Sequence, residues 1–163
     1  MTDAISNRRL LQVHPTLVEK VNAAANFLAM EGQYFRVAQG LRTYAEQDAL
    51  YAQGRTAEGK IVTNAKGGYS NHNFGMAVDC YPFISGSSGD LNWDAESEQF
   101  QRMVAALKAQ GLIWGGDWKT LKDPPHFQLA GAPVSPTDAD RAAFSQGGIQ
   151  AVWKLYPELG ASV

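Results

Sequence analysis

The sequence predicts an α+β domain with a small, mostly antiparallel sheet flanked by helices. Two observations lead to this fold class. The hydrophobic period changes several times along the chain, as it does where helices and strands alternate within one domain. No internal repeat and no linker divides the 163 residues, and a chain of this length buries roughly two thirds of its unfolded surface around one core. We therefore expect a single domain over residues 1–163.

A helix and a strand are expected first. Pro15 stands where a first helical residue is favoured, and Gly32 ends the pattern that follows. The apolar residues of that pattern fall on one helical face, which consists of Leu17, Val21, Ala24 and Leu28. The next segment, YFRVAQGLR over 34–42, has the character of a strand.

A second helix follows this strand directly. Residues 43–54 open with Thr43 and Glu46 at the spacing of a capping box and close on a glycine. Residues 55–71 are polar and rich in Gly and Asn, too long for a tight turn and without a hydrophobic pattern. We expect this segment to be a surface loop that covers a cleft.

The middle of the chain carries a strand with two unlike faces. Alternate residues of the segment 75–83 point to opposite faces, so that Asp79 points away from the face of Met76 and Cys80. After a second loop, ISGSSGDLN, a helix is expected near 95–110. Its apolar residues recur at helical spacing until a glycine, and they are Phe100, Met103, Val104 and Leu107.

The last elements are two short strands and a helical tail. The segments LIW (112–114) and HFQLA (126–130) favour sheet, and His126 and Gln128 share a face of the second one. A helical tail over about 135–157 begins at SPTD, and two successive glycines at 147 and 148 split it.

Composition limits the classes of function. The chain carries 14 basic and 16 acidic residues, a formal charge of -2, so neither nucleic acid nor a membrane is an expected partner. No apolar run approaches the ~20 residues that span a bilayer, and the first residues lack the apolar core of a secretory signal. We expect a protein made in the cytoplasm without a signal peptide. Cys80 is the only cysteine, so no internal disulfide forms.

The few histidines suggest a metal site. A catalytic zinc ion takes three protein ligands from His, Asp or Glu and leaves one position open, and His72, Asp79 and His126 meet that count. Gly75 allows close backbone approach beside His72, and the strand that follows carries Asp79 inward among apolar neighbours. The third histidine of the chain, His14, is assigned a structural role at a helix start.

Four segments resemble a known family. SNHNFGMAVD (70–79) resembles the Ser-x-His-x-x-Gly-x-Ala-x-Asp motif of the zinc D-alanyl-D-alanine metallopeptidase superfamily, and DPPHFQL (123–129) resembles its second signature. GLRTYAEQDALYAQGR (40–55) looks like the family's Arg-Ser/Thr segment and Glu-Gln helix. LQVHPTLVEKV (11–21) is similar to the start of the L-alanyl-D-glutamate endopeptidase branch, which includes phage endolysins. The resemblance covers residues 10–130 approximately.

The resemblance implies a role for each matching residue. It implies that His72, Asp79 and His126 bind one zinc ion, that Asp123 is the catalytic base, and that Arg42 faces the substrate carbonyl. A carboxylate beside the metal can take the proton of the attacking water, and a fixed guanidinium can stabilise the charge that develops on the carbonyl oxygen.

Structural alternatives stand beside two of these roles and beside one further candidate residue. Asp123 precedes two prolines and could only start a turn, and Arg42 could only pair with Glu46 on the next helix. Ser70 is a candidate for hydrogen bonding a ligand or the substrate, although serines before loops also cap or turn the chain.

The expected function is hydrolysis of the bond between L-alanine and D-glutamate in the peptide stem of peptidoglycan. A short domain of this kind also looks like a monomeric phage endolysin, an antimicrobial protein of host lysis that reaches the wall once the membrane is opened. Three alternatives remain: a D-alanyl-D-alanine carboxypeptidase, a non-catalytic zinc-stabilised wall-binding module, and a cysteine peptidase using Cys80. The last would need a reactive thiol, whereas Cys80 lies on the apolar face of its strand and is expected to be buried and inert.

Overall fold

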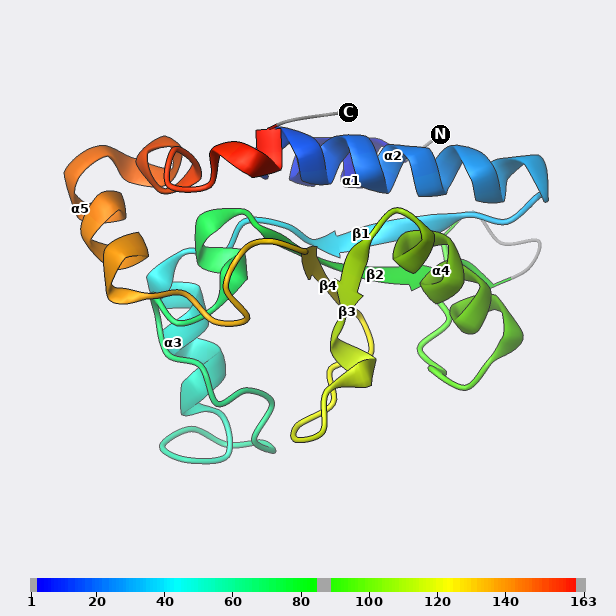
Figure 1. Cartoon of the computed structure of the whole chain (residues 1–163). Helices are drawn as coiled ribbons and strands as arrows, with labels where there is room; N and C mark the ends of the chain where they lie inside the picture. The colour runs from blue at the N-terminus through cyan, green and yellow to red at the C-terminus, as the bar shows by residue number, and fades with distance from the viewer. Residues whose placement is uncertain (1–2, 85–88, 161–163) are drawn as a thin grey trace.

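The computed structural model describes residues 3–84 and 89–160 and has α+β architecture (Figure 1). Its α-helices are α1 (Ala4–Leu10), α2 (Pro15–Met30), α3 (Tyr44–Ala52), α4 (Glu98–Ala109) and α5 (Asp138–Trp153). Its strands are β1 (Phe35–Gln39), β2 (Ala77–Pro82), β3 (Leu112–Trp114) and β4 (His126–Leu129). Three short 3₁₀ helices complete the described part: η1 (Asn71–Phe74), η2 (Gly115–Asp117) and η3 (Pro157–Gly160).

The four strands form one sheet in the order β1-β2-β4-β3, and each neighbouring pair is antiparallel. The predicted α+β class is therefore confirmed. Helices α1 and α2 lie along one side of the sheet, while α3 and the segment 115–125 project on the other side (Figure 1). The register of β2 and β4 pairs Asp79 with His126 and Val78 with Phe127. Because side chains alternate across a sheet, the two polar residues share one face and the two apolar residues share the other.

The core lies on the helix-covered face. Met76, Val78 and Cys80 are all fully buried there, as the alternation in this strand predicted. The apolar stripe of α2 is buried as well, and so is that of α4. This packing fixes β2 from one side and leaves Asp79 on the other.

The strongly patterned helices occur where the sequence predicted them. Thr43 and Glu46 form the predicted capping box at the start of α3. The backbone of α5 leaves helical geometry at Gly147 and Gly148, which is the expected split of the tail. The predicted strand over 112–114 matches β3, and the other three predicted strands are one to four residues too long, because residues at their ends form loops, turns or isolated bridges instead of continuous ladder pairs.

The sequence did not predict α1. Asp3 caps this helix by accepting a hydrogen bond from the Ser6 amide at 2.7 Å, and its carboxylate also pairs with Arg36 of β1. The Ser6 hydroxyl accepts a hydrogen bond from the Val37 amide at 2.9 Å. Seven residues are too few for a clear helical pattern, and these contacts with β1 stabilise the helix instead.

The loop predicted over 84–92 lies partly outside the described residues. On either side of that gap, Phe83 and Leu91 form an isolated antiparallel bridge. Among the described helices, none is both long enough and apolar enough to cross a membrane.

Candidate metal centre

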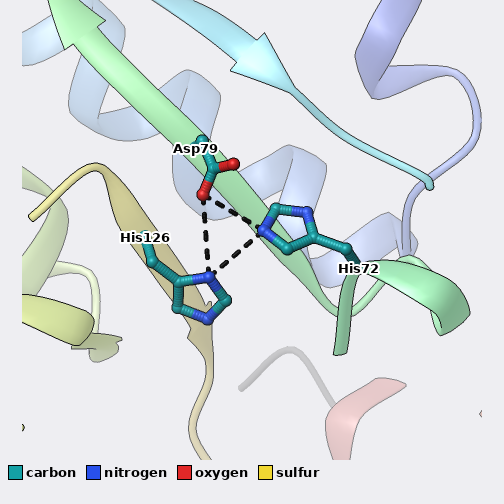
Figure 2. Close-up of side chains that lie close together, drawn as sticks. All are labelled: His72, Asp79 and His126. Atoms are coloured by element: carbon teal, nitrogen blue, oxygen red, sulfur yellow. Dashed lines mark hydrogen bonds and ion pairs between the residues drawn. The ribbon is translucent and has the colours of Figure 1, made fainter. Parts of the chain in front are cut away.

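Three side chains from separate elements converge on one point (Figure 2). His72 Nε2 lies 3.1 Å from Asp79 Oδ1 and 3.1 Å from His126 Nδ1, and the third side of this triangle, from His126 Nδ1 to Asp79 Oδ1, is 3.6 Å. The two rings are buried, and the carboxylate is partly exposed. These are the three residues that the sequence proposed as ligands, and the fold brings them together.

Local backbone structure explains the convergence. Asp79 and His126 are direct cross-strand partners of β2 and β4. His72 belongs to η1, which ends at Gly75 in the left-handed conformation with φ of 64°. A Cβ at Gly75 would lie 2.9 Å from the Gln12 carbonyl oxygen. The predicted need for glycine therefore has two causes, positive φ and close approach.

The hydrogen-bond partners of the two outward ring nitrogens show which nitrogen of each ring carries the proton. His72 Nδ1 lies 2.9 Å from the Gly40 carbonyl oxygen, which can only accept, so Nδ1 carries the proton. His126 Nε2 lies 2.9 Å from Gln128 Oε1, which assigns the proton of that ring to Nε2. The inward nitrogens then present lone pairs to each other and to a carboxylate.

This donor set fits a zinc ion. Three lone-pair donors at 3.1 to 3.6 Å repel one another unless a cation lies between them. Zinc ligands at ~2.1 Å in tetrahedral geometry are about 3.4 Å apart, close to the observed separations. Two imidazoles and one carboxylate also form a known type of catalytic zinc site.

The charges around Asp79 keep its carboxylate ionised. Burial alone would raise the pKa of Asp79, but the His72 and His126 rings, when they are protonated in the absence of a metal, lower it well below its usual range. Arg42 Nη2 donates to Asp79 Oδ2 at 3.2 Å, which leaves Oδ1 directed at the histidines. The carboxylate can therefore serve as an anionic ligand.

Arg42 lies at the cluster, and its position corrects one alternative. The guanidinium contacts Asp79 and also donates from Nη1 to Gln47 Oε1 at 2.9 Å. The suggested pairing with Glu46 is wrong, because the Glu46 carboxylate accepts hydrogen bonds from the Thr43 amide and hydroxyl at the start of α3.

Asp123 lies at the edge of the cluster, in the turn that enters β4. Its carbonyl oxygen accepts from the His126 amide, and its own amide donates to the Gly115 carbonyl oxygen, both at 3.1 Å. Burial and the charge of Asp79 raise the pKa of the Asp123 carboxyl, and the nearby His126, His72 and Arg42 oppose that rise only in part. The turn that was offered as a structural alternative exists, but it also carries the carboxyl close to the three candidate ligands.

The remaining candidates occupy structural positions. Ser70 caps η1, with its hydroxyl accepting from the His72 amide at 3.4 Å. His14 lies outside the cluster, where its ring caps α2 and packs against Trp153. Cys80 is fully buried, and burial together with Asp79 raises the pKa of its thiol well above the usual value. A thiol in that state is a poor nucleophile.

Sequence reasoning missed three supporting residues. Gln47 links Arg42 to the Ala65 carbonyl oxygen, Gln128 contacts His126, and Gly115 lies against the Asp123 turn. The position of Gln128 on the His126 face of its strand was a usable signal. Gln47 belongs to the Glu-Gln helix that the resemblance marked, whereas no comparable signal marked Gly115.

Comparison with known proteins assigns the family. A sequence profile described as D-alanyl-D-alanine carboxypeptidase matches residues 63–129, which include all three candidate ligands. Over 124 residues the chain is 38% identical to the peptidoglycan L-alanyl-D-glutamate endopeptidase CwlK of Bacillus subtilis (strain 168), a match spanning 72% of this chain and 73% of that protein. The chain belongs to the zinc D-alanyl-D-alanine metallopeptidase family. Within this family it is a member of the L-alanyl-D-glutamate endopeptidase branch, as its motifs suggested.

Two further relatives agree with this assignment, and a third, more distant structure shares the fold. The metallopeptidase is 36% identical over 61 residues to the L-alanyl-D-glutamate peptidase of Listeria phage A118, a match spanning 37% of this chain and 21% of that protein. The crystal structure of the Serratia marcescens L-Ala D-Glu endopeptidase ChiX superposes with a TM-score of 0.57 and 32% identity, covering 78% of this chain and 87% of that one. The vancomycin resistance D,D-pentapeptidase VanY, solved with Zn(II), shares the fold at 18% identity and a TM-score of 0.52, covering 89% of this chain and 78% of that one.

Proposed function

We propose that this metallopeptidase hydrolyses the bond between L-alanine and D-glutamate in the peptide stem of peptidoglycan. The observation that carries the proposal is the convergence of His72 Nε2, Asp79 Oδ1 and His126 Nδ1 at a point bordered by Asp123. The choice of bond is supported by the relatives at 38% and 32% identity, which are both named as endopeptidases for it.

One zinc ion would be held by His72, Asp79 and His126. When bound, zinc supplies a Lewis acid that polarises the carbonyl oxygen and makes water a nucleophile near neutral pH. The protein supplies the rest of the site. Metal ligands must be neutral rings and an ionised carboxylate, and the Gly40 and Gln128 acceptors leave the inward nitrogen of each ring free for that state.

Asp123 would move the proton. Its carboxylate takes a proton from the attacking water as the water oxygen bonds to the carbonyl carbon, and it returns that proton to the amine nitrogen when the C–N bond breaks. A general base works best when its pKa lies close to the working pH. The raised pKa of Asp123, caused by burial and by Asp79, is in the direction that this role needs.

Arg42 and Ser70 would contact the substrate. A guanidinium has five N–H donors, and the bonds to Gln47 and Asp79 fix the group while leaving others to donate to the developing carbonyl oxyanion. The Ser70 hydroxyl accepts from the His72 amide, and a hydroxyl also has a proton to donate. We assign that proton to a backbone carbonyl of the substrate.

The biological setting is proposed to be that of an endolysin. The relative from a Listeria phage supports a role in host lysis, in which the protein accumulates in the cytoplasm and reaches the wall when the membrane is opened. A monomer suffices for catalysis, because all the residues assigned above belong to one chain. We propose one catalytic domain over residues 1–163, with the family motifs in 10–130 and a helical tail over 135–157.

A second candidate function is removal of the terminal D-alanine. It is supported by the description of the matching family profile and by the fold shared with VanY. A wall-binding module without catalysis is less well supported, since it would need neither Asp123 nor Arg42 beside the metal ligands.

Digestion of purified peptidoglycan separates these functions. The products are labelled at new amino groups and identified by mass spectrometry, with the His72→Ala variant as a control for contaminating peptidases. The proposal predicts new amino termini on D-glutamate. Release of D-alanine alone would assign the carboxypeptidase function, and no wild-type product above the His72→Ala background would favour the wall-binding module.

A further inference from the structure

Gln128 is the polar residue that touches the far side of the His126 ring. It lies two residues further along β4 on the same face, opposite Ala77 of β2, and its side chain is fully buried. Its Oε1 lies 2.9 Å from His126 Nε2. A fully buried amide is costly unless its polar atoms are paired, so its presence beside the cluster calls for an explanation.

The surroundings of Gln128 fix which way its amide points. Its Nε2 donates to the Val134 carbonyl oxygen across 3.5 Å. A carbonyl accepts only, so a flipped amide would place two oxygens against each other. Oε1 therefore faces the ring, and it can only accept the proton of His126 Nε2.

The two histidines of the cluster are held by partners of different kinds. His72 donates from Nδ1 to the Gly40 carbonyl oxygen, a main-chain group that no side-chain substitution removes. His126 depends on the Gln128 side chain for the corresponding bond. The Trp118 ring, 5.0 Å from the His126 ring, packs against it but is tilted, and it offers no acceptor.

We propose that Gln128 is a positioning residue for the metal centre. By accepting the Nε2 proton, it holds His126 in one tautomer, fixes the rotation of its ring, and keeps the Nδ1 lone pair directed at the ion. The proposal rests on the proposed function in so far as His126 is taken to be a metal ligand. Partners behind a ligating histidine orient the ring and raise its basicity, and their loss typically costs 10- to 100-fold in metal affinity.

The test measures zinc affinity, not hydrolysis. The metal-free wild-type chain and two variants, Gln128→Met and Gln128→Glu, are titrated with zinc in competition with a chromophoric chelator. Methionine has a similar volume but gives the ring no comparable acceptor, whereas a buried glutamate that is protonated on its outer oxygen keeps an acceptor toward the ring and donates to the Val134 carbonyl in place of the amide. We expect Gln128→Met to bind zinc about 10- to 100-fold more weakly, and Gln128→Glu to stay within a few-fold of the wild type.

Two controls separate positioning from general destabilisation. Ser6→Ala removes another fully buried acceptor, the one bonded to the Val37 amide far from the cluster, and it should leave zinc affinity unchanged. Long-range ¹H–¹⁵N spectra of the zinc-loaded chains report the tautomers directly. The wild type should carry the proton on Nε2 of His126 and on Nδ1 of His72, and only the His126 signals should change in Gln128→Met.

Each outcome has a distinct meaning. Equal zinc affinity in the wild type and Gln128→Met would overturn the role of Gln128, as would equal losses in Gln128→Met and Gln128→Glu. A proton on Nδ1 of His126 in the wild type would also overturn it. Failure of the wild type itself to bind zinc would instead refute the metal site on which the proposed function depends. If Gln128→Met does not fold, the affinity of Gln128→Glu and the wild-type tautomer decide the question.

Discussion

A methyl group added at Gly115 should disable the site by displacing the turn that carries Asp123, while every proposed catalytic residue stays in place in the sequence. The Cβ of an alanine would lie 2.5 Å from the Asp123 carbonyl oxygen, 3.0 Å from His126 Cβ and 3.2 Å from Asp123 Cβ. Ordinary contacts begin near 3.4 Å, so the turn that carries Asp123 must move by about 1 Å. A displacement of that size in a reacting group can cost about 10²-fold in rate, and overpacking of this kind costs about 1–3 kcal/mol of stability.

The assay pairs kcat on a stem peptide with urea denaturation of the same Gly115→Ala sample. Gly89→Ala is the matched control, because a Cβ there meets no atom within 4 Å and both properties should stay near wild type. Zinc content should fall less than kcat if the displacement acts mainly on Asp123. A Gly115→Ala variant with a kcat within about two-fold of the wild type would refute the argument that this contact positions the turn.

Three further perturbations test separate parts of the site. Asp123→Asn keeps the size of the side chain but cannot take up the proton, so it should bind one zinc while hydrolysis falls by about 10²-fold or more; loss of zinc would make Asp123 a ligand. Arg42→Lys should fold normally and lose most of the rate, since an ammonium lacks the planar fork held by Gln47 and Asp79; a near-normal kcat would return Arg42 to a structural role. Burial lowers the pKa of His14, whose Nδ1 accepts a hydrogen bond at the start of α2. As the pH falls, the imidazole is therefore protonated in the unfolded chain before it is protonated in the folded chain. The cap's contribution of about 1 kcal/mol is full above pH ~6.5 and is lost below it. His14→Asn should therefore lose less free energy of unfolding than the wild type between pH 7 and pH 5, as measured by urea titrations. If the free energy of unfolding falls equally with pH in both chains, His14 is not the source of the pH dependence.

The helices and the central strand could be predicted because each carries its own signal. The apolar stripe of α2 and the capping box of α3 lie within a few residues of sequence. In β2 the alternation of apolar residues was enough to place Asp79 on the face away from the core. These features depend on the spacing of residues close together in the chain, which can be read from the sequence.

What could not be predicted depends on contacts across the fold. Helix α1 is stabilised by bonds from Asp3 and Ser6 to a strand about thirty residues away. The close approach between Gly115 and Asp123 and the bond between Arg42 and Gln47 depend on the detailed geometry of a turn and of a helix start. Residue types alone do not reveal such contacts. The pairing of Arg42 with Glu46 was wrong for the same reason, because Asp79, distant in sequence, is the nearer acid in space.

The central claim is that His72, Asp79 and His126 together hold the metal on which hydrolysis depends. Zinc content measured by elemental analysis of the purified wild type, His72→Ala, His126→Ala and His14→Asn chains tests it most directly. We predict close to one zinc per chain in the wild type and in His14→Asn, and almost none in the other two. A wild type without metal, or His72→Ala and His126→Ala chains that retain stoichiometric zinc, would contradict the claim.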